Sequence, residues 1–153
     1  MHNFNQVRMG PITTISVSVS PDFLVDIDAL DDDNTGWVFK INPDALKDAE
    51  MGGENYKHLL IYSSYKEIQH LGDKDSCVLD ILVKFRVFIP SDMVDLENPE
   101  EFAEGCILYP TGVSVWTHIR NASLSASSTF SKPILLSIDP PDNVSFQFFY
   151  KDQ

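Results

Sequence analysis

Apolar and polar residues alternate over several stretches of the chain, with the period of two that is typical of β-strands. Residues 12–19 show this pattern first, and Pro21 follows and ends it. The apolar face of this stretch carries Ile15, Val17 and Val19. A second stretch, residues 37–41, follows Gly36 and is rich in aromatic and β-branched residues. Both stretches predict half-buried strands.

Residues 56–71 fit two periods. Part of their apolar pattern suits a helix, but apolar and polar side chains also alternate from His58 to Tyr65. The polar turn 71–76 contains a glycine, and residues 77–89, which follow it, are strongly β-branched and aromatic. This context favours the strand. We therefore predict a long hairpin with arms at 56–71 and 77–89, ended by Pro90.

Proline positions mark two short helical segments. Asn42-Pro43 is typical of a capped helical turn, because a side chain that accepts a hydrogen bond precedes a residue suited to the first helical position. Pro99 begins a possible short helix inside the acidic loop 92–104. Both segments are predicted to connect larger elements.

The segment 110–124 is ambiguous from its residues alone. Its β-branched side chains alternate acceptably for a strand, whereas Tyr109-Pro110 is typical of a helix start. At helical spacing one face would carry Gly112, Val115, Trp116, Ile119 and Ser123. A run rich in serine, 123–128, then marks a break. Helix and strand both remain open at this point.

Composition and charge restrict the class of protein. The chain has 153 residues, 43% of them hydrophobic, which is enough for one domain with a core. Its net charge of -12 repels phosphate backbones and anionic membrane surfaces. No apolar run reaches spanning length and the first residues lack a leader pattern. We expect a cytoplasmic protein with no nucleic-acid partner and no membrane insertion.

Residues that could support catalysis or bind metal do not form a known pattern. The histidines (His2, His58, His70 and His118) are scattered, and Cys77 and Cys106 form no pair, so we expect two buried thiols. Asp31, Asp33 and Gly36 fit half of a calcium loop, but Asn42 stands where a bidentate glutamate is needed. No nucleophile motif is present. The sequence predicts no catalytic residue, no metal and no cofactor, and therefore a protein that is not an enzyme.

Three short motifs, and the order of the elements, resemble a known family. Phe4-x-x-Val7-Arg8-Met9 precedes the first strand, and the second strand follows a long crossing loop. Ile107-Leu108-Tyr109-Pro110 comes before the ambiguous segment, and Pro133, Leu135 and Pro140 mark an extended segment after it. This arrangement resembles the bacterial SecB export chaperones, which have an aliphatic-aromatic-proline entry to the main helix and a proline-flanked segment after it. The resemblance favours the helix for 110–124.

The resemblance implies an α+β fold, with one domain over residues 1–153. A four-stranded antiparallel sheet would carry one main helix packed on one face. The crossing loop and the helix would form apolar grooves for unfolded or preprotein segments, so the protein would be an ATP-independent holdase in protein folding and transport. The peptide-binding residues expected from this are Phe23, Leu24, Ile27, Trp37, Trp116 and Ile119. A homo-oligomer, dimer or tetramer, is expected as in that family.

The end of the sequence departs from the family pattern. SecB chaperones end in a second helix and a flexible tail, whereas residues 143–153 alternate and are aromatic, which favours an extended conformation. We therefore expect a divergent member without the full C-terminal helix and without tail-mediated contact with the translocation motor. Two alternatives stay open: a dedicated SecB-like chaperone of a toxin–antitoxin system, and a non-enzymatic interaction or phage structural protein on the same fold.

Overall fold

The computed structural model describes residues 6–20, 36–71, 74–129 and 133–149. Within 69–71 and 74–76 the description covers the backbone alone. Three of the residues expected to bind peptide, Phe23, Leu24 and Ile27, lie outside the described residues, as does the acidic run 31–33.

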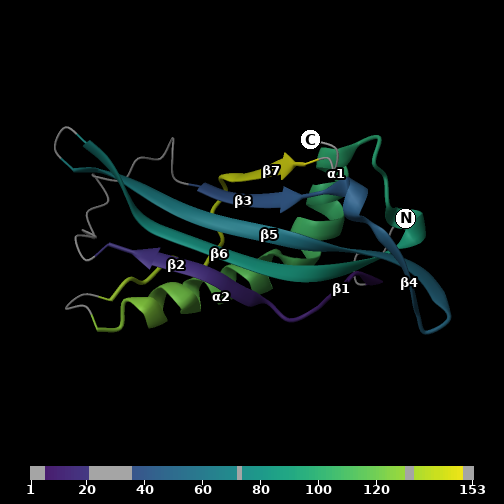
Figure 1. Ribbon diagram of the computed structural model, residues 1–153, viewed down its shortest axis with the longest axis horizontal. Coiled ribbons are helices and arrows are strands. Elements are labelled where there is room, and N and C mark those ends of the chain that lie inside the picture. The colour runs from purple at the N-terminus through teal and green to yellow at the C-terminus, as the bar shows by residue number, and fades with distance from the viewer. Residues whose placement is uncertain (1–5, 21–35, 72–73, 130–132, 150–153) are drawn as a thin grey trace.

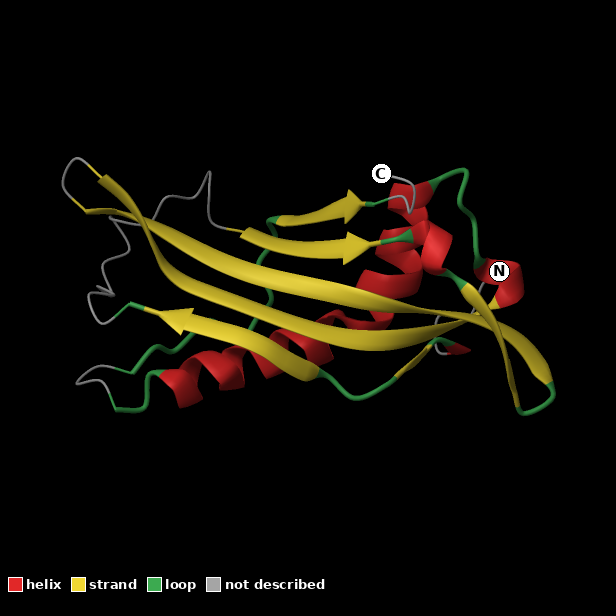
Figure 2. Ribbon diagram, in the orientation of Figure 1, coloured by secondary structure: helices red, strands yellow, loops and turns green. Residues whose placement is uncertain are grey.

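One mixed sheet is the main element of the α+β fold (Figures 1 and 2). Along its main path the strand order is β1-β6-β5-β3-β7, and β2 also pairs with β6 while β4 also pairs with β5. The strands are β1 (Arg8–Met9), β2 (Thr13–Val19), β3 (Gly36–Ile41), β4 (Lys47–Met51), β5 (Glu54–Leu71), β6 (Lys74–Pro90) and β7 (Val144–Phe148).

The sheet has 7 strands, so the prediction of four antiparallel strands is wrong in number. β1 and β4 lie outside the predicted strands 12–19 and 37–41 and were not predicted: β1 and β2 both run antiparallel to β6, while β3 and β4 both run antiparallel to β5. Gly10-Pro11 separates the first pair, and the 3-10 turn η3 (Pro43–Ala45) separates the second. Proline lacks the N–H that a sheet ladder requires.

The prediction that all strands are antiparallel is wrong at the edge of the sheet formed by β7. β7 runs parallel to β3, with Trp37 opposite Val144 and Ile41 opposite Phe148. The extended conformation predicted for the last residues is thus confirmed over Val144–Phe148. In Figure 1 the chain crosses behind the sheet between α2 and β7, which brings this strand to the far edge.

The long hairpin is confirmed by the pairing of β5 with β6 from Tyr56 opposite Pro90 to Leu71 opposite Lys74. A second, shorter hairpin joins β4 to β5. Its two turn residues, Gly52 and Gly53, have φ values of 61° and 81°. These conformations are strained for residues with a Cβ, which explains glycine at both positions.

The helical prediction for 110–124 is confirmed as α2 (Tyr109–Ala126), and the two proline-marked turns are confirmed as η3 and α1 (Pro99–Ala103). Another 3-10 turn, η4 (Ser91–Met93), precedes α1. A π-helical turn, η5 (Glu104–Leu108), links α1 directly to α2, so Pro110 lies within a longer helical run. The wider turn suits proline, whose missing N–H and bulky ring disturb regular α-helical hydrogen bonds.

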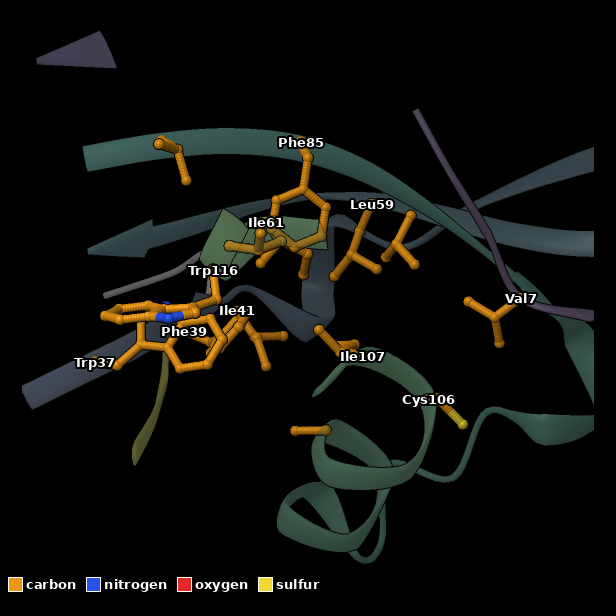
Figure 3. Close-up of a cluster of buried hydrophobic side chains, with 14 of the residues drawn as sticks. Val7, Trp37, Phe39, Ile41, Leu59, Ile61, Phe85, Cys106, Ile107 and Trp116 are labelled. Atoms are coloured by element: carbon orange, nitrogen blue, oxygen red, sulfur yellow. The ribbon is translucent and has the colours of Figure 1, made fainter. Parts of the chain in front are cut away.

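The core lies between α2 and one face of the sheet (Figure 3). Alternate residues of each strand point to it, and the fully buried side chains include Phe39 and Ile41 of β3, Ile61 of β5 and Phe85 of β6. The ring centroids of Trp37 and Trp116 are 5.5 Å apart, which joins sheet to helix. Burial of each large side chain contributes about 1.5–3 kcal/mol to folding.

One of the two cysteines is not buried as predicted. Cys106 lies in the core, where burial raises the pKa of its thiol to about 11, but Cys77 is exposed. The reason is a bulge in β6: Glu67 pairs with Leu79 and Ile68 with Cys77, so Val78 is an extra residue. Val78 and Leu79 both point inward, and this shift turns Cys77 outward.

The close contact between α2 and β3 depends on Gly112. A Cβ at this position would lie 3.2 Å from Leu108 Cδ1 and 3.8 Å from the Trp37 ring. We predict that Gly112→Leu lowers the free energy of unfolding by about 2–3 kcal/mol, because the added side chain separates α2 from Trp37. Ser114→Leu on the exposed side of α2 is the control and should change it by less than about 0.5 kcal/mol. Urea unfolding measures both, and equal effects would contradict the close-packing role.

Candidate functional site

Three residues that the sequence placed in a binding groove lie in the core instead. Trp37, Trp116 and Ile119 are exposed by 1%, 2% and 0%. Trp116 packs against Trp37 and, edge to face, against Tyr65, and Ile119 belongs to the same cluster. Their side chains join the sheet to α2 and do not line an accessible groove. Trp residues occur both at binding surfaces and in protein cores, so the sequence could not decide whether Trp37 and Trp116 bind a peptide or fill the core.

Trp116 nevertheless contacts the surface of the protein through its indole N–H. The segment after α2, residues 133–140, runs back along the helix, and we call it the strap. The Trp116 Nε1–H donates to the carbonyl of Ser137 at 2.9 Å, and Arg120 Nε donates to the carbonyl of Leu136 at 3.2 Å. Side chains of α2 therefore hold the strap by its backbone.

A serine at the end of α2 anchors the beginning of the strap. The amide of Ile134 donates to Ser127 Oγ at 2.8 Å, and that hydroxyl in turn donates to the carbonyl of Ser123 at 2.8 Å. Ile134 is buried, and Leu136 packs partly against the core. The strap is thus attached at three successive points along one side of the helix.

Two aliphatic side chains of the strap point into solvent. Leu135 is 75% exposed and Ile138 is 77% exposed. Large apolar side chains this exposed are unusual when they occur together, and they commonly mark contact surfaces. The backbone hydrogen bonds at Leu136 and Ser137 keep the strap in the conformation that presents them.

The flank of α2 beside the strap adds further apolar surface. Val113 is 71% exposed, and Leu124 is also exposed. These residues lie seven positions before and four after Arg120, so all three share one side of the helix. Arg120, which bonds to the strap, is the one Lys, Arg, Asp or Glu residue between 109 and 126. We call the surface made by Val113, Leu124, Leu135 and Ile138 the strap surface.

Polar groups elsewhere in the described residues do not assemble into a reactive site. Tyr65 donates its hydroxyl hydrogen to Glu67 Oε1 at 2.7 Å, and burial raises the pKa of both side chains. This pair lies on the core face of β5, under Trp116, where a substrate has no access. Among these residues, no three histidine, cysteine, aspartate or glutamate side chains come together as a metal site requires.

Comparison of the chain with models of known protein families gives no match, and comparison with curated proteins gives none either. None of the helices in the described part of the chain is long and apolar enough to cross a membrane. The case for a function therefore depends on the strap surface itself.

Sequence reasoning did not select the strap surface as a binding site, although part of its signal was visible. Pro133 and Pro140 flank Ile134-Leu135-Leu136-Ser137-Ile138, which is too apolar for an ordinary loop. What the sequence could not reveal was which of these side chains α2 covers. That depends on the hydrogen bonds from Trp116 and Arg120.

We predict that Trp116→Phe loosens the strap. The phenylalanine ring still fills much of the core site but cannot donate to Ser137, which should cost about 1 kcal/mol and increase the rate at which chymotrypsin cleaves after Leu135 and Leu136. Trp37→Phe is the matched control, because it removes an indole N–H that donates to Ser63 Oγ within the core. Equal acceleration of strap cleavage in both variants would show that Trp116 has no special role there.

Proposed function

We propose that this protein is an ATP-independent holdase that binds unfolded or preprotein segments on the strap surface. The observation that carries the proposal is the pair of exposed aliphatic side chains, Leu135 and Ile138, on a strap held by backbone hydrogen bonds. Such a surface gains free energy when it covers apolar side chains of another chain.

The strap is already held in place before a client binds, so binding costs little conformational entropy in the strap. Donors from Trp116 and Arg120 already occupy two strap carbonyls, so a client segment contacts a surface whose shape is set. The net charge of -12 keeps a protein with exposed apolar residues in solution. The same charge favours unfolded clients that are basic.

The order of elements supports a SecB-like fold. A strand that begins near Arg8 is followed, after residues 21–35, by a second strand, then by the long hairpin, the main helix and an extended segment flanked by prolines. This is the order from which the resemblance was inferred. The edge strand β7 is the departure, since SecB chaperones continue with a second helix and a tail.

That departure favours one alternative, a chaperone dedicated to a single client, such as the partner in a toxin–antitoxin system. Residues 144–148, which would otherwise be available for a second helix, are part of the sheet. A general holdase should protect several unrelated unfolded proteins from aggregation. A dedicated chaperone should protect one, and a structural protein on the same fold should protect none.

We predict that Leu135→Ser/Ile138→Ser weakens client binding about tenfold while the thermal midpoint changes by less than about 2 °C. Both side chains contribute apolar area to a complex and little to folding. Aggregation of an unfolded client, followed by light scattering, reports binding. Ile134→Ser is the control, since this neighbour is buried and its replacement should lower the midpoint clearly. Unchanged protection by the double variant would rule out the strap surface as the client site.

We also predict that the chain forms a homo-oligomer through β2. Thr13–Val19 carries no charged residue and pairs with β6 along one side, which leaves an edge able to pair with a second copy. Multi-angle light scattering at micromolar concentration should therefore give a dimer or tetramer. Ser16→Lys/Ser18→Lys places charges on this edge and should yield monomers. The matched variant Ser145→Lys/Gln147→Lys alters β7 at the opposite edge and should leave the oligomer intact. A monomeric parent protein would contradict the prediction.

A further inference from the structure

Part of the sheet face turned away from α2 is exposed in the described residues. Strand alternation places Tyr62, Ser64 and Lys66 of β5 on this face, next to Leu82 and Lys84 of β6. Tyr62 and Lys66 are exposed there, whereas Ser64 is buried. Figure 1 views the sheet from this side, with α2 lying behind. We call this surface the open face.

The open face is basic although the protein is strongly acidic. Among the strand residues whose side chains the structure describes, alternation and the strand registers place six lysine and arginine residues there, against two acidic residues, Glu54 and Asp80. The basic residues are Arg8, Lys40, Lys47, Lys66, Lys84 and Arg86. A molecule with a net charge of -12 thus carries a local surface of the opposite sign.

The basic side chains lie in cross-strand rows. Lys40 of β3 and Lys84 of β6 both pair with Tyr62 of β5, so this exposed aromatic residue has a lysine on each neighbouring strand. Lys66 lies opposite Asp80, toward the hairpin end. Because neighbouring strands are about 4.8 Å apart, the two lysines that flank Tyr62 are about 10 Å apart at their Cα atoms.

Arg86 is held in place by its neighbours on the same face. Its guanidinium donates to His58 Nδ1 at 2.8 Å, and the imidazole stacks on Phe88 with ring centroids 5.5 Å apart. Burial lowers the pKa of His58, and the charges of Arg86 and Lys47 lower it further, which favours the neutral imidazole that can accept this hydrogen bond. The positive charge of Arg86 therefore stays on a supported side chain.

Apolar side chains lie between the charged rows. Val38, Leu60 and Leu82 are half-buried and belong to the same face. A surface of half-buried aliphatic residues separated by lysines suits a polypeptide that carries acidic and apolar side chains together. Nucleic acid suits it less, because the described face offers few exposed aromatic rings for base stacking and its aliphatic residues match apolar side chains better than they match phosphates.

We propose that the open face binds an acidic polypeptide segment of a partner protein. The segment would lie across β3, β5 and β6, with its carboxylates near Lys40, Lys84 and Arg86. The strap surface lies on the other side of the sheet, so a client and an acidic partner can bind at the same time. The proposal is independent of the holdase function, and either can fail alone.

The test measures fluorescence anisotropy of a labelled peptide of alternating glutamate and serine. We expect saturable binding that Lys40→Gln/Lys84→Gln weakens about tenfold, since the variant removes two charges that would face the carboxylates of the peptide. Asp80→Asn should strengthen binding, because it removes a negative charge from the face. Unfolding of a variant cannot produce such a gain in affinity. A lysine-serine peptide of the same length should not bind there.

The matched control is Asn55→Asp/Lys57→Gln, which changes the net charge by the same amount at β5 positions on the other side of the strand. It should alter the affinity by less than about twofold, because only distant charges change. If both double variants weaken peptide binding equally, the loss of affinity follows from the net charge of the protein and the proposal is overturned. Absence of saturable binding would also overturn it, as would tighter binding of a single-stranded oligothymidylate to the same lysines.

Discussion

The contact between Trp37 and Trp116 determines how the sheet and the helix fit together, and other features of the surface follow from it. Trp37 comes from β3 and Trp116 from α2, and Gly112 lets the helix approach closely enough for the rings to meet. The buried indole of Trp116 also carries an N–H that needs a hydrogen-bond acceptor. The carbonyl of Ser137 in the strap accepts this hydrogen bond. Packing of the core and position of the strap are thus coupled through one side chain.

This coupling explains why buried and exposed apolar residues lie next to each other in the strap. Once Trp116 and Arg120 bond to successive carbonyls, the backbone of residues 136–137 is held against α2. Ile134 then points inward while Leu135 and Ile138 point outward. A protein that exposes such side chains needs a means of staying in solution, and a net charge of -12 supplies it. The strap surface and the acidic composition are therefore compatible parts of one holdase hypothesis.

The sheet separates two kinds of surface because its side chains alternate. Every second residue of β5 and β6 contributes to the core, and the residues between them form the open face. The basic residues that share the open face are scattered along the sequence from Arg8 to Arg86, so no run of positive charge is visible there. Net charge alone indicated repulsion of anions, whereas the registers of the strands place lysines from β3 and β6 on either side of Tyr62.

The sequence by itself was sufficient for the elements whose signal is local. Alternation and a glycine-containing turn predicted the β5–β6 hairpin. For α2 the residues alone left helix and strand open, because Tyr109-Pro110 favoured a helix while the β-branched side chains also suited a strand, and the family resemblance was needed to favour the helix. The orientation of β7 was predicted incorrectly because it depends on a partner strand distant in sequence. β7 runs parallel to β3 because the crossing after α2 returns it to that edge, and strand orientation leaves no mark in a run such as Val144–Phe148.

The apolar character of Trp37, Trp116 and Ile119 was likewise evident from sequence, but their burial was not. A hydrophobic side chain gains free energy when it leaves water. Its hydrophobicity does not reveal whether the atoms that cover it belong to the same chain or to a partner. Tertiary structure decided this by placing α2 against one face of the sheet, which buries these three residues and leaves Leu135 and Ile138 exposed. The sequence determined which residues are apolar and therefore gain free energy by burial. Only the packing of the folded chain decided which of them are buried and which stay exposed.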